Sequence, residues 1–181
     1  MDIDWSAVGA IGGLFSVTVA VVALVLQGRR SHIALQTDLL LKYYDRFYSP
    51  EMHKLRQTAA QQLLAGKSPN YELEDVLDYF GIIGALLERK VLDHKLAYGL
   101  FDWWILRYWS CAQEYIKARR QYSADPDPEM WAYLDRLVGE LRDYRKEHGS
   151  PEIPKSALCS FLEEEARSGD RDTPKPVVQA G

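Results

Sequence analysis

The feature that most constrains this chain is an apolar run at residues 7–26, AVGAIGGLFSVTVAVVALVL. The run carries no charged side chain, and its only polar side chains are the hydroxyls of Ser16 and Thr18. A helix rises about 1.5 Å per residue, so a run of this length spans the roughly 30 Å hydrocarbon core of a bilayer. We therefore predict a transmembrane helix and assign residues 1–28 to an N-terminal membrane anchor.

Two other interpretations of this run are a buried helix of a soluble protein and a cleavable signal peptide. A signal peptide needs a basic start, a shorter apolar core and a cleavage site between small residues. Here Asp2 and Asp4 make the start acidic, and Gln27-Gly28-Arg29-Arg30 follows the run without an Ala-x-Ala site. The pattern favours an anchor that is retained.

The charges on either side of the run predict its orientation. Residues 1–28 carry a net charge of −2, residues 29–60 carry +3, and the remainder carries −5. Basic residues beside a span stay in the cytoplasm, so Arg29 and Arg30 place the C-terminal part inside and the N-terminus outside the inner membrane of a bacterium. These two arginines would lie at the anionic membrane surface.

Small residues gather along one face of the predicted span. They follow a G-x-x-x-G pattern with four-residue spacing, and they are Gly9, Gly12, Gly13, Ser16 and Ala20. Small side chains let two membrane helices approach closely, which predicts association with a second copy or with another membrane protein. The alternative is that glycine is simply common in membrane spans.

The rest of the chain predicts an all-α fold. Helical periodicity recurs and the alternation typical of strands is absent. We expect an antiparallel cytosolic bundle of about five helices at residues 29–148, a short amphipathic helix at 149–168 and a disordered tail at 169–181. The net charge of −4 argues against a nucleic-acid-binding domain.

Start and stop signals divide this part of the chain. Cap–proline–acid triplets at residues 49–51, 127–129 and 150–152 predict helix starts, Asn70 is a further cap, and Gly66 and Gly149 predict helix ends. One continuous aromatic helix is expected at residues 95–122. Gly81 and Gly84 lie inside a predicted helix, where each costs about 1 kcal/mol relative to alanine, so close contact with a neighbouring helix is expected there.

Apolar stripes at helical spacing predict the buried faces of these helices. The expected buried residues are Met52, Leu55, Ala59 and Leu63; Leu73, Val76, Leu77, Phe80, Ile83 and Leu87; Phe101, Trp104, Tyr108, Ala112 and Tyr115; Met130, Leu134, Leu137, Leu141 and Tyr144; and Ala157, Leu158, Phe161 and Leu162.

Motifs that carry catalytic or metal chemistry are missing from the sequence. The four histidines fit neither H-E-x-x-H nor E-x-x-H spacing, and there is no P-loop, no G-x-G-x-x-G and no G-x-S-x-G motif. Cys111 and Cys159 form no C-x-x-C pair, and Cys111 reads as a small core residue rather than a nucleophile. We expect no catalytic residue, no metal ligand, no cofactor and no enzyme activity.

The segment at residues 101–109, FDWWILRYW, is the most unusual part of the chain. Trp103, Trp104 and Trp109 cannot all face one core, so with Arg107 they form a candidate surface for a partner or ligand. The alternative is a helix buried between several others. Arg119 and Arg120 extend this candidate surface, or else they only complement the dipole at the helix end.

The chain resembles a family of small bacterial membrane-anchored proteins known only as a domain of unknown function. The resemblance covers roughly residues 5–148. It follows the basic end of the apolar run and the residues Asp38, Tyr44, Asp78-Tyr79-Phe80, Val91-Leu92-Asp93, Tyr108-Trp109, Ile116, Arg119-Arg120, Met130-Trp131 and Leu134. Gly81 stands where that family often has an acid. The resemblance implies an anchored helical domain and supplies no catalytic residues.

These observations lead to two functional hypotheses. In the first, the lipid bilayer anchors the chain and its helical domain acts by protein–protein interaction, as an accessory subunit, a scaffold or a stress or defence effector. In the second, the domain is a sensor that binds a small anionic ligand or lipid in an aromatic-lined pocket. An enzyme with an unrecognised site is a more remote alternative.

Overall fold

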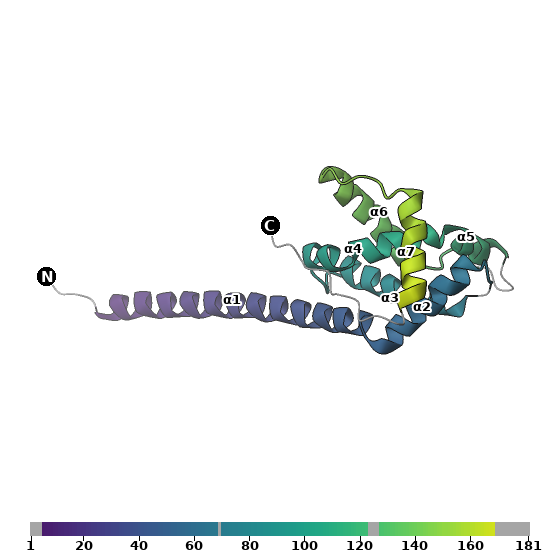
Figure 1. Cartoon of the computed structure of the whole chain (residues 1–181). Helices are drawn as coiled ribbons and strands as arrows, with labels where there is room; N and C mark the ends of the chain where they lie inside the picture. Colours follow the sequence, from purple (N-terminus) through teal and green to yellow (C-terminus); the bar gives the residue numbers. More distant parts are fainter. Residues whose placement is uncertain (1–4, 69, 123–126, 169–181) are drawn as a thin grey trace. The chain divides into compact units, whose positions relative to one another are not determined.

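The computed structural model describes residues 5–68, 70–122 and 127–168, apart from the side chains of residues 5–22, 25, 29 and 122. Within these residues the chain forms seven α-helices and no strand, which confirms the predicted all-α fold. The helices are α1 (Trp5–Phe47), α2 (Pro50–Leu64), α3 (Tyr71–Glu88), α4 (His94–Cys111), α5 (Gln113–Tyr122), α6 (Ala132–Glu147) and α7 (Lys155–Arg167) (Figure 1).

The chain divides into two compact units, Met1–Leu39 and Leu40–Gly181. This boundary falls inside α1 and later than the predicted boundary after residue 28. The end of α1 belongs to the second unit, where Leu40 and Phe47 are fully buried. The second unit also contains α7, which we had assigned to a separate segment.

Across the residues that the structure describes, no helix has an apolar stretch long enough to cross a membrane. The span predicted at residues 7–26 falls, as far as residue 22, on side chains outside the described ones. The predicted tail at residues 169–181 is outside the described residues as well.

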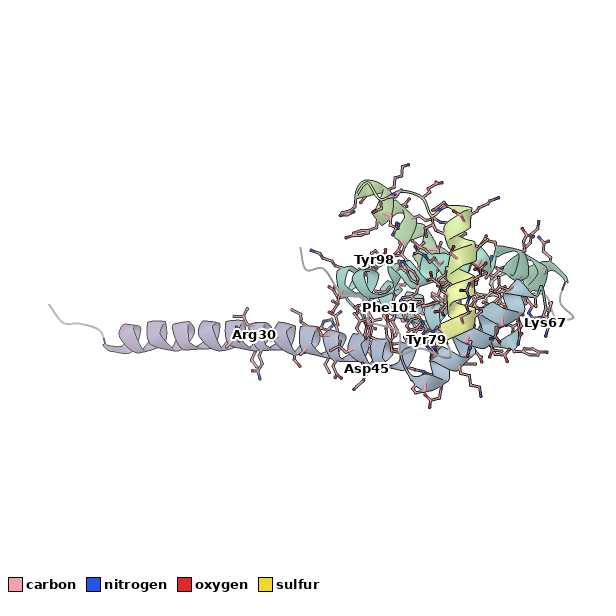
Figure 2. All side chains as sticks on the ribbon, viewed as in Figure 1. Arg30, Asp45, Lys67, Tyr79, Tyr98 and Phe101 are labelled. Atoms are coloured by element: carbon pink, nitrogen blue, oxygen red, sulfur yellow. The ribbon has the colours of Figure 1, made fainter. Side chains whose placement is uncertain are left out.

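Most residues predicted for the membrane region lie outside the described side chains. They are Gly9, Gly12, Gly13, Ser16, Ala20 and Arg29. Arg30 is described and exposed on α1 (Figure 2).

Side-chain caps begin three helices of the bundle. The Ser49 Oγ accepts a hydrogen bond from the Met52 N–H at 3.3 Å, and Pro50 holds the first position of α2. The Asn70 Oδ1 accepts from the Leu73 N–H at 2.9 Å, and the Asp93 Oδ1 accepts from the Leu96 N–H at 2.7 Å. The cap predictions at Ser49 and Asn70 are confirmed.

Two glycines end helices as predicted. Gly66 and Gly149 follow α2 and α6 with φ values of +62° and +67°. This left-handed conformation costs a glycine little, since it has no Cβ to clash with the following carbonyl.

The core lies around α3, whose predicted stripe is entirely buried. Its six predicted residues and Tyr79 are shielded from solvent. Figure 2 shows Tyr79 and Phe101 inside the bundle, where their ring centroids lie 6.4 Å apart. The α3 helix packs against α2, α6 and α4, and α7 lies along α2 (Figure 1).

Gly84 explains how α3 and α6 approach each other. A Cβ built on Gly84 would lie 2.7 Å from the Tyr133 carbonyl oxygen. The predicted close contact is therefore confirmed at Gly84. Gly81 has nothing within 4 Å of such a Cβ, so the same prediction is wrong there.

Three predicted features of the helices are wrong. Ala112 divides the expected helix at residues 95–122 into α4 and α5. The last two helices also begin later than their cap–proline–acid triplets. Trp131 is left-handed, at φ 61°, immediately before α6. Ile153 precedes Pro154, which disfavours helical backbone there, and α7 begins at Lys155.

Burial on α2 differs from the prediction at one position that matters for function. Met52 and Ala59 are buried as expected, but Leu55 is only half-buried. The side chain that α2 buries between them is Arg56, with 2% of its surface exposed.

Candidate functional site

The aromatic segment of α4 is mostly internal. Trp109 is buried and Trp104 is half-buried, whereas Trp103 exposes 39% of its surface. The rings of Trp103 and Trp104 lie 5.3 and 6.0 Å from the ring of Phe161 on α7. The helix therefore contributes mainly to packing, and Trp103 is its outermost indole.

Arg107 lies against this outer indole. Its guanidinium carbon is 4.0 Å from the centroid of the Trp103 ring, and its Nη1 donates to the Trp103 carbonyl oxygen at 3.1 Å. Burial lowers the pKa of Arg107 from its usual value. Arg107 is thus held by its own helix rather than extended toward solvent.

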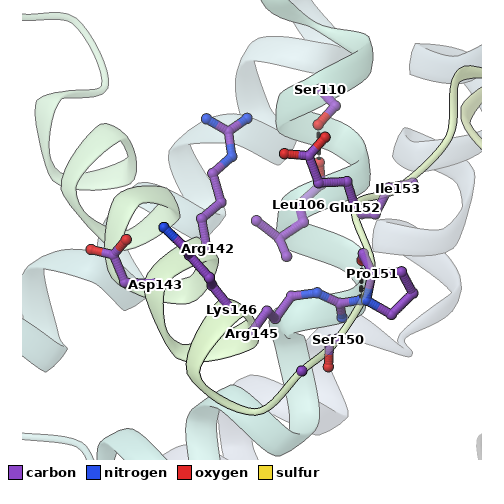
Figure 3. Close-up of a pocket in the computed structure, with 11 residues that line it drawn as sticks. Leu106, Ser110, Arg142, Asp143, Arg145, Lys146, Ser150, Pro151, Glu152 and Ile153 are labelled. Atoms are coloured by element: carbon purple, nitrogen blue, oxygen red, sulfur yellow. Dashed lines mark hydrogen bonds between the residues drawn. The ribbon is translucent and has the colours of Figure 1, made fainter.

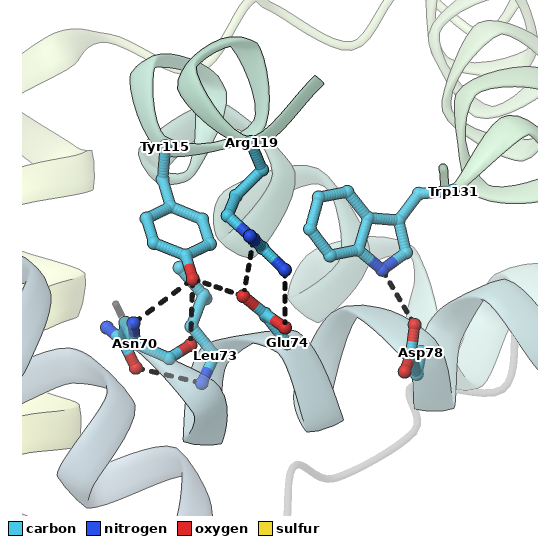
Figure 4. Close-up of polar contacts among 7 residues, drawn as sticks. All are labelled: Asn70, Leu73, Glu74, Asp78, Tyr115, Arg119 and Trp131. Carbon is cyan, nitrogen blue, oxygen red and sulfur yellow. Dashed lines mark hydrogen bonds and ion pairs between the residues drawn. The ribbon is translucent and has the colours of Figure 1, made fainter. Parts of the chain in front are cut away.

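The predicted basic residues of α5, Arg119 and Arg120, take part in ion pairs within the chain. The Arg119 Nε lies 2.8 Å from Glu74 Oε1, and the Tyr115 hydroxyl donates to the same carboxylate (Figure 4). The Arg120 Nη2 lies 2.6 Å from Asp135 Oδ2. Neither arginine is left with a free charge for a ligand.

A neighbouring contact ties the start of α6 to α3. The Trp131 Nε1 donates to Asp78 Oδ1 at 2.7 Å (Figure 4). Burial raises the pKa of Asp78, although this hydrogen bond opposes the shift. The left-handed backbone at Trp131 belongs to this connection.

The six residues of the candidate surface thus belong to two separate groups of contacts. Trp103, Trp104 and Arg107 lie on the part of α4 that contacts α7. The other three, Trp109, Arg119 and Arg120, belong to contacts among α3, α4, α5 and α6: the guanidinium carbon of Arg120 lies 5.9 Å from the Trp109 ring centroid.

A buried arginine site, which the sequence analysis missed, lies where α2, α4 and α7 meet. The Arg56 guanidinium carbon is 4.2 Å from the Phe47 ring centroid and 4.7 Å from that of Trp104. The Arg56 Nη2 lies 3.1 Å from His53 Nδ1. Among the described residues, Arg56 Nε and Nη1 have no hydrogen-bond acceptor.

The counter-charge at this site comes from a helix that lies far from Arg56 in the sequence. Glu165 of α7 is 5% exposed, and its Oε2 lies 3.7 Å from Arg56 Nε. The same oxygen accepts the Tyr108 hydroxyl at 2.5 Å. Burial is the main cause that raises the pKa of Tyr108, so the phenol remains a donor.

This site has the chemistry of carboxylate recognition. A planar guanidinium between two aromatic faces is pre-oriented, and a carboxylate is its usual counter-ion. Cys111, which lies near Tyr108, has its pKa raised to about 11 by burial, so it is a weak nucleophile at neutral pH. In the part of the chain that the structure describes, no three His, Cys, Asp or Glu side chains are arranged to hold a metal ion.

An open pocket of about 640 Å³ lies beside α6 and the segment that leads to α7 (Figure 3). Arg142, Arg145 and Lys146 line it together with Asp143 and Glu152. Arg145 is already paired, because its Nη1 lies 3.2 Å from Asp102 Oδ2. Arg142 and Lys146 are exposed and have no ion pair among the described residues.

Comparison with protein families gives one match. The model of the family described as "Domain of unknown function (DUF4760)" matches residues 10–141. The searches of curated proteins and of solved structures returned no match. The matched region contains Arg56 and Tyr108 but ends before α7.

Proposed function

The chain belongs to the family described as "Domain of unknown function (DUF4760)", a description that names no function. From the chain's own residues we propose a single-pass inner-membrane protein whose cytosolic helical domain acts by contact with other proteins.

The observation that carries this proposal is the exposure of large apolar side chains along α1. Leu24, Ile33 and Leu35 expose 68%, 62% and 66% of their surfaces. Exposed apolar side chains that recur along one helix indicate a surface that lipid or another protein covers.

The position of each of these residues along α1 indicates whether lipid or protein covers it. Leu24 lies within the uncharged run at residues 7–26, so lipid covers it in the proposed arrangement. Ile33 and Leu35 follow Arg29 and Arg30, beyond the hydrocarbon core, so contacts with protein cover them on opposite sides of the helix. The partner is a second copy or another membrane protein, and the small-residue face at residues 9–20 supports close helix approach.

Alkaline carbonate extraction of membranes tests the anchor. The wild-type chain should remain in the membrane pellet, and a chain with Val19→Lys and Val21→Lys should be released. Each lysine near the centre of a span costs about 3 kcal/mol of insertion. The matched control adds the same charges at Ser156 and Ser160, which are exposed on α7, and should stay in the pellet. Release of the wild-type chain would overturn the proposal.

The pocket in Figure 3 supports a second candidate, a membrane-anchored sensor of a small anionic ligand or lipid headgroup. Arg142 and Lys146 supply two cations there that form no ion pair with any described residue. The pocket differs from the aromatic-lined pocket we expected, since Leu106 and Ser110 are the α4 residues that line it.

A thermal-shift screen of the full chain in detergent tests the sensor. Nucleotides and short-chain anionic lipids should raise the melting temperature, and Arg142→Ala with Lys146→Ala should abolish the rise. The matched control is Arg136→Ala, which removes a cation paired with Glu88 at 3.0 Å elsewhere on α6. The sensor is excluded if none of these anions shifts the wild-type chain.

A further inference from the structure

The surface that α2 and α4 present to α7 recognises two side chains of α7. Among the described residues of α7, only Phe161 and Glu165 are buried. They are four residues apart and so lie on the same face of the helix. The remaining side chains of α7 are half-buried or exposed.

Each of these two side chains has its own set of contacting residues. The Phe161 ring meets Trp103, Trp104 and Tyr108 edge-on, with centroids 5.3, 6.0 and 5.0 Å away. The Glu165 carboxylate faces the Arg56 guanidinium and accepts the Tyr108 hydroxyl. Tyr108 contacts both side chains, so the two sites form one continuous surface under α7, which we call the groove.

The other contacts to α7 are made with its backbone. Gln57 and Gln61 donate to the Ala166 carbonyl oxygen at 3.3 and 3.0 Å, and the ring of His53 lies 2.9 Å from the Ser168 carbonyl oxygen. Every helix presents free carbonyl oxygens at its C-terminus. These contacts therefore accept a helix end of any sequence.

The family match covers the groove but not its occupant. The groove residues fall between 47 and 108, inside the region matched by the family, whereas α7 follows the end of that region at residue 141. An occupant without a carboxylate would cover Arg56 and supply no counter-charge, and a buried unpaired charge is strongly destabilising. The groove thus requires an acidic occupant, and α7 supplies one here.

We propose that this groove is a docking site for an amphipathic helix of a partner protein that presents Phe and Glu four residues apart, and that α7 occupies it as a built-in competitor. The inference rests on the proposed action by protein contact and names the chemistry of the partner. A partner must compete with a tethered helix, whose effective concentration is of order millimolar.

The experiment uses the full chain in detergent, with Cys159→Ser so that Cys111 is the only thiol. The probe is a fluorescent peptide of residues 153–168 with the same Cys→Ser change, and binding is followed by anisotropy. Displacement of α7 is followed by the rate of alkylation of Cys111, a half-buried residue whose Sγ lies 3.8 Å from the Leu158 carbonyl oxygen of α7.

We expect the unaltered α7 to exclude the peptide and a weakened α7 to admit it. Phe161→Ala and Glu165→Gln in the chain should each raise peptide affinity at least tenfold and speed alkylation of Cys111. The control, Glu163→Gln, alters an exposed carboxylate of α7 that pairs with Arg167 of the same helix and should change neither. Peptides that carry Phe161→Ala or Glu165→Gln should not bind, and this result does not depend on folding of a variant chain.

Three results would overturn the inference. Faster alkylation of Cys111 without peptide binding would show that the groove does not accept a helix in trans. Unchanged alkylation in both chain variants would show that α7 is a fixed part of the domain. A dimer of the wild-type chain that exchanges α7 would assign the groove to a second copy. Because the assay needs no bilayer, it is independent of carbonate extraction.

Discussion

Gly81 and Gly84 are both interior residues of α3, but only Gly84 touches a neighbouring helix. Gly84→Ala should lower the free energy of unfolding by about 1–3 kcal/mol, because its Cβ would press on the Tyr133 carbonyl oxygen at 2.7 Å. Gly81→Ala should raise it by up to about 1 kcal/mol, since the site is open and alanine favours helix. Urea unfolding of both variants checks the pair, and equal effects would contradict the account.

The Arg56–Glu165 pair provides a second prediction for single residues. Arg56→Met should destabilise the domain by about 3 kcal/mol, because Glu165 would stay buried without its counter-charge. Adding Glu165→Gln should recover part of this loss, as Gln can still accept the Tyr108 hydroxyl. Thermal unfolding of the two single variants and the double variant gives the interaction free energy between the two side chains. Strictly additive losses would show that the two side chains do not interact.

Helical spacing could have identified Arg56 in part. Residues 52, 56 and 59 share a face of α2, and two of them are apolar. That spacing predicts burial of position 56, and a buried arginine implies a counter-ion. It cannot name Glu165, because the two lie on helices that only the folded chain brings together.

Among the helix ends, the end of α3 lacks the glycine found after α2 and α6. Lys90 is left-handed there, at φ 56°, and its N–H bonds the Leu87 carbonyl oxygen at 2.8 Å. Lys90→Gly should raise the free energy of unfolding by about 1 kcal/mol, because it removes the Cβ strain. Arg89→Gly is the control at φ −78° and should destabilise. The measurement is denaturant unfolding. A higher free energy of unfolding for Arg89→Gly than for Lys90→Gly would contradict this prediction.

The cover that α7 gives to Cys111 predicts a pH dependence. Burial raises the thiol pKa to about 11, and the thiolate is the reactive form. In the Cys159→Ser chain, alkylation should therefore speed up about tenfold per pH unit through the range below that pKa. Rates measured by mass spectrometry check the slope. A plateau near pH 9 would contradict the raised pKa of Cys111.

Sequence signals for helices failed where tertiary contacts set the boundary. The triplet at residues 127–129 forms a turn instead of a helix start, because Trp131 turns left-handed and bonds Asp78. At Ser49 and Asn70 the cap lies next to the helix it begins, and there the sequence was sufficient.

At the scale of the whole molecule, the all-α class followed from periodicity, but the unit boundary did not. Hydropathy changes near residue 28, whereas packing changes at Leu40, where α1 joins the bundle. Charge distribution and hydropathy report on the environment of a segment, and contacts report on its partners. The proposed anchor rests on the first kind of information and the docking groove on the second.

The most direct test of the central proposal, an anchored chain with its helical domain in the cytosol, is thiol labelling in bacterial spheroplasts with a membrane-impermeant maleimide. One chain keeps the exposed Cys159 as its only thiol through Cys111→Ser, and another carries Ser6→Cys with both native cysteines replaced by Ser. The account predicts that the Ser6→Cys chain is labelled in intact spheroplasts and that Cys159 is labelled only after permeabilisation. Labelling of Cys159 in intact spheroplasts would contradict it.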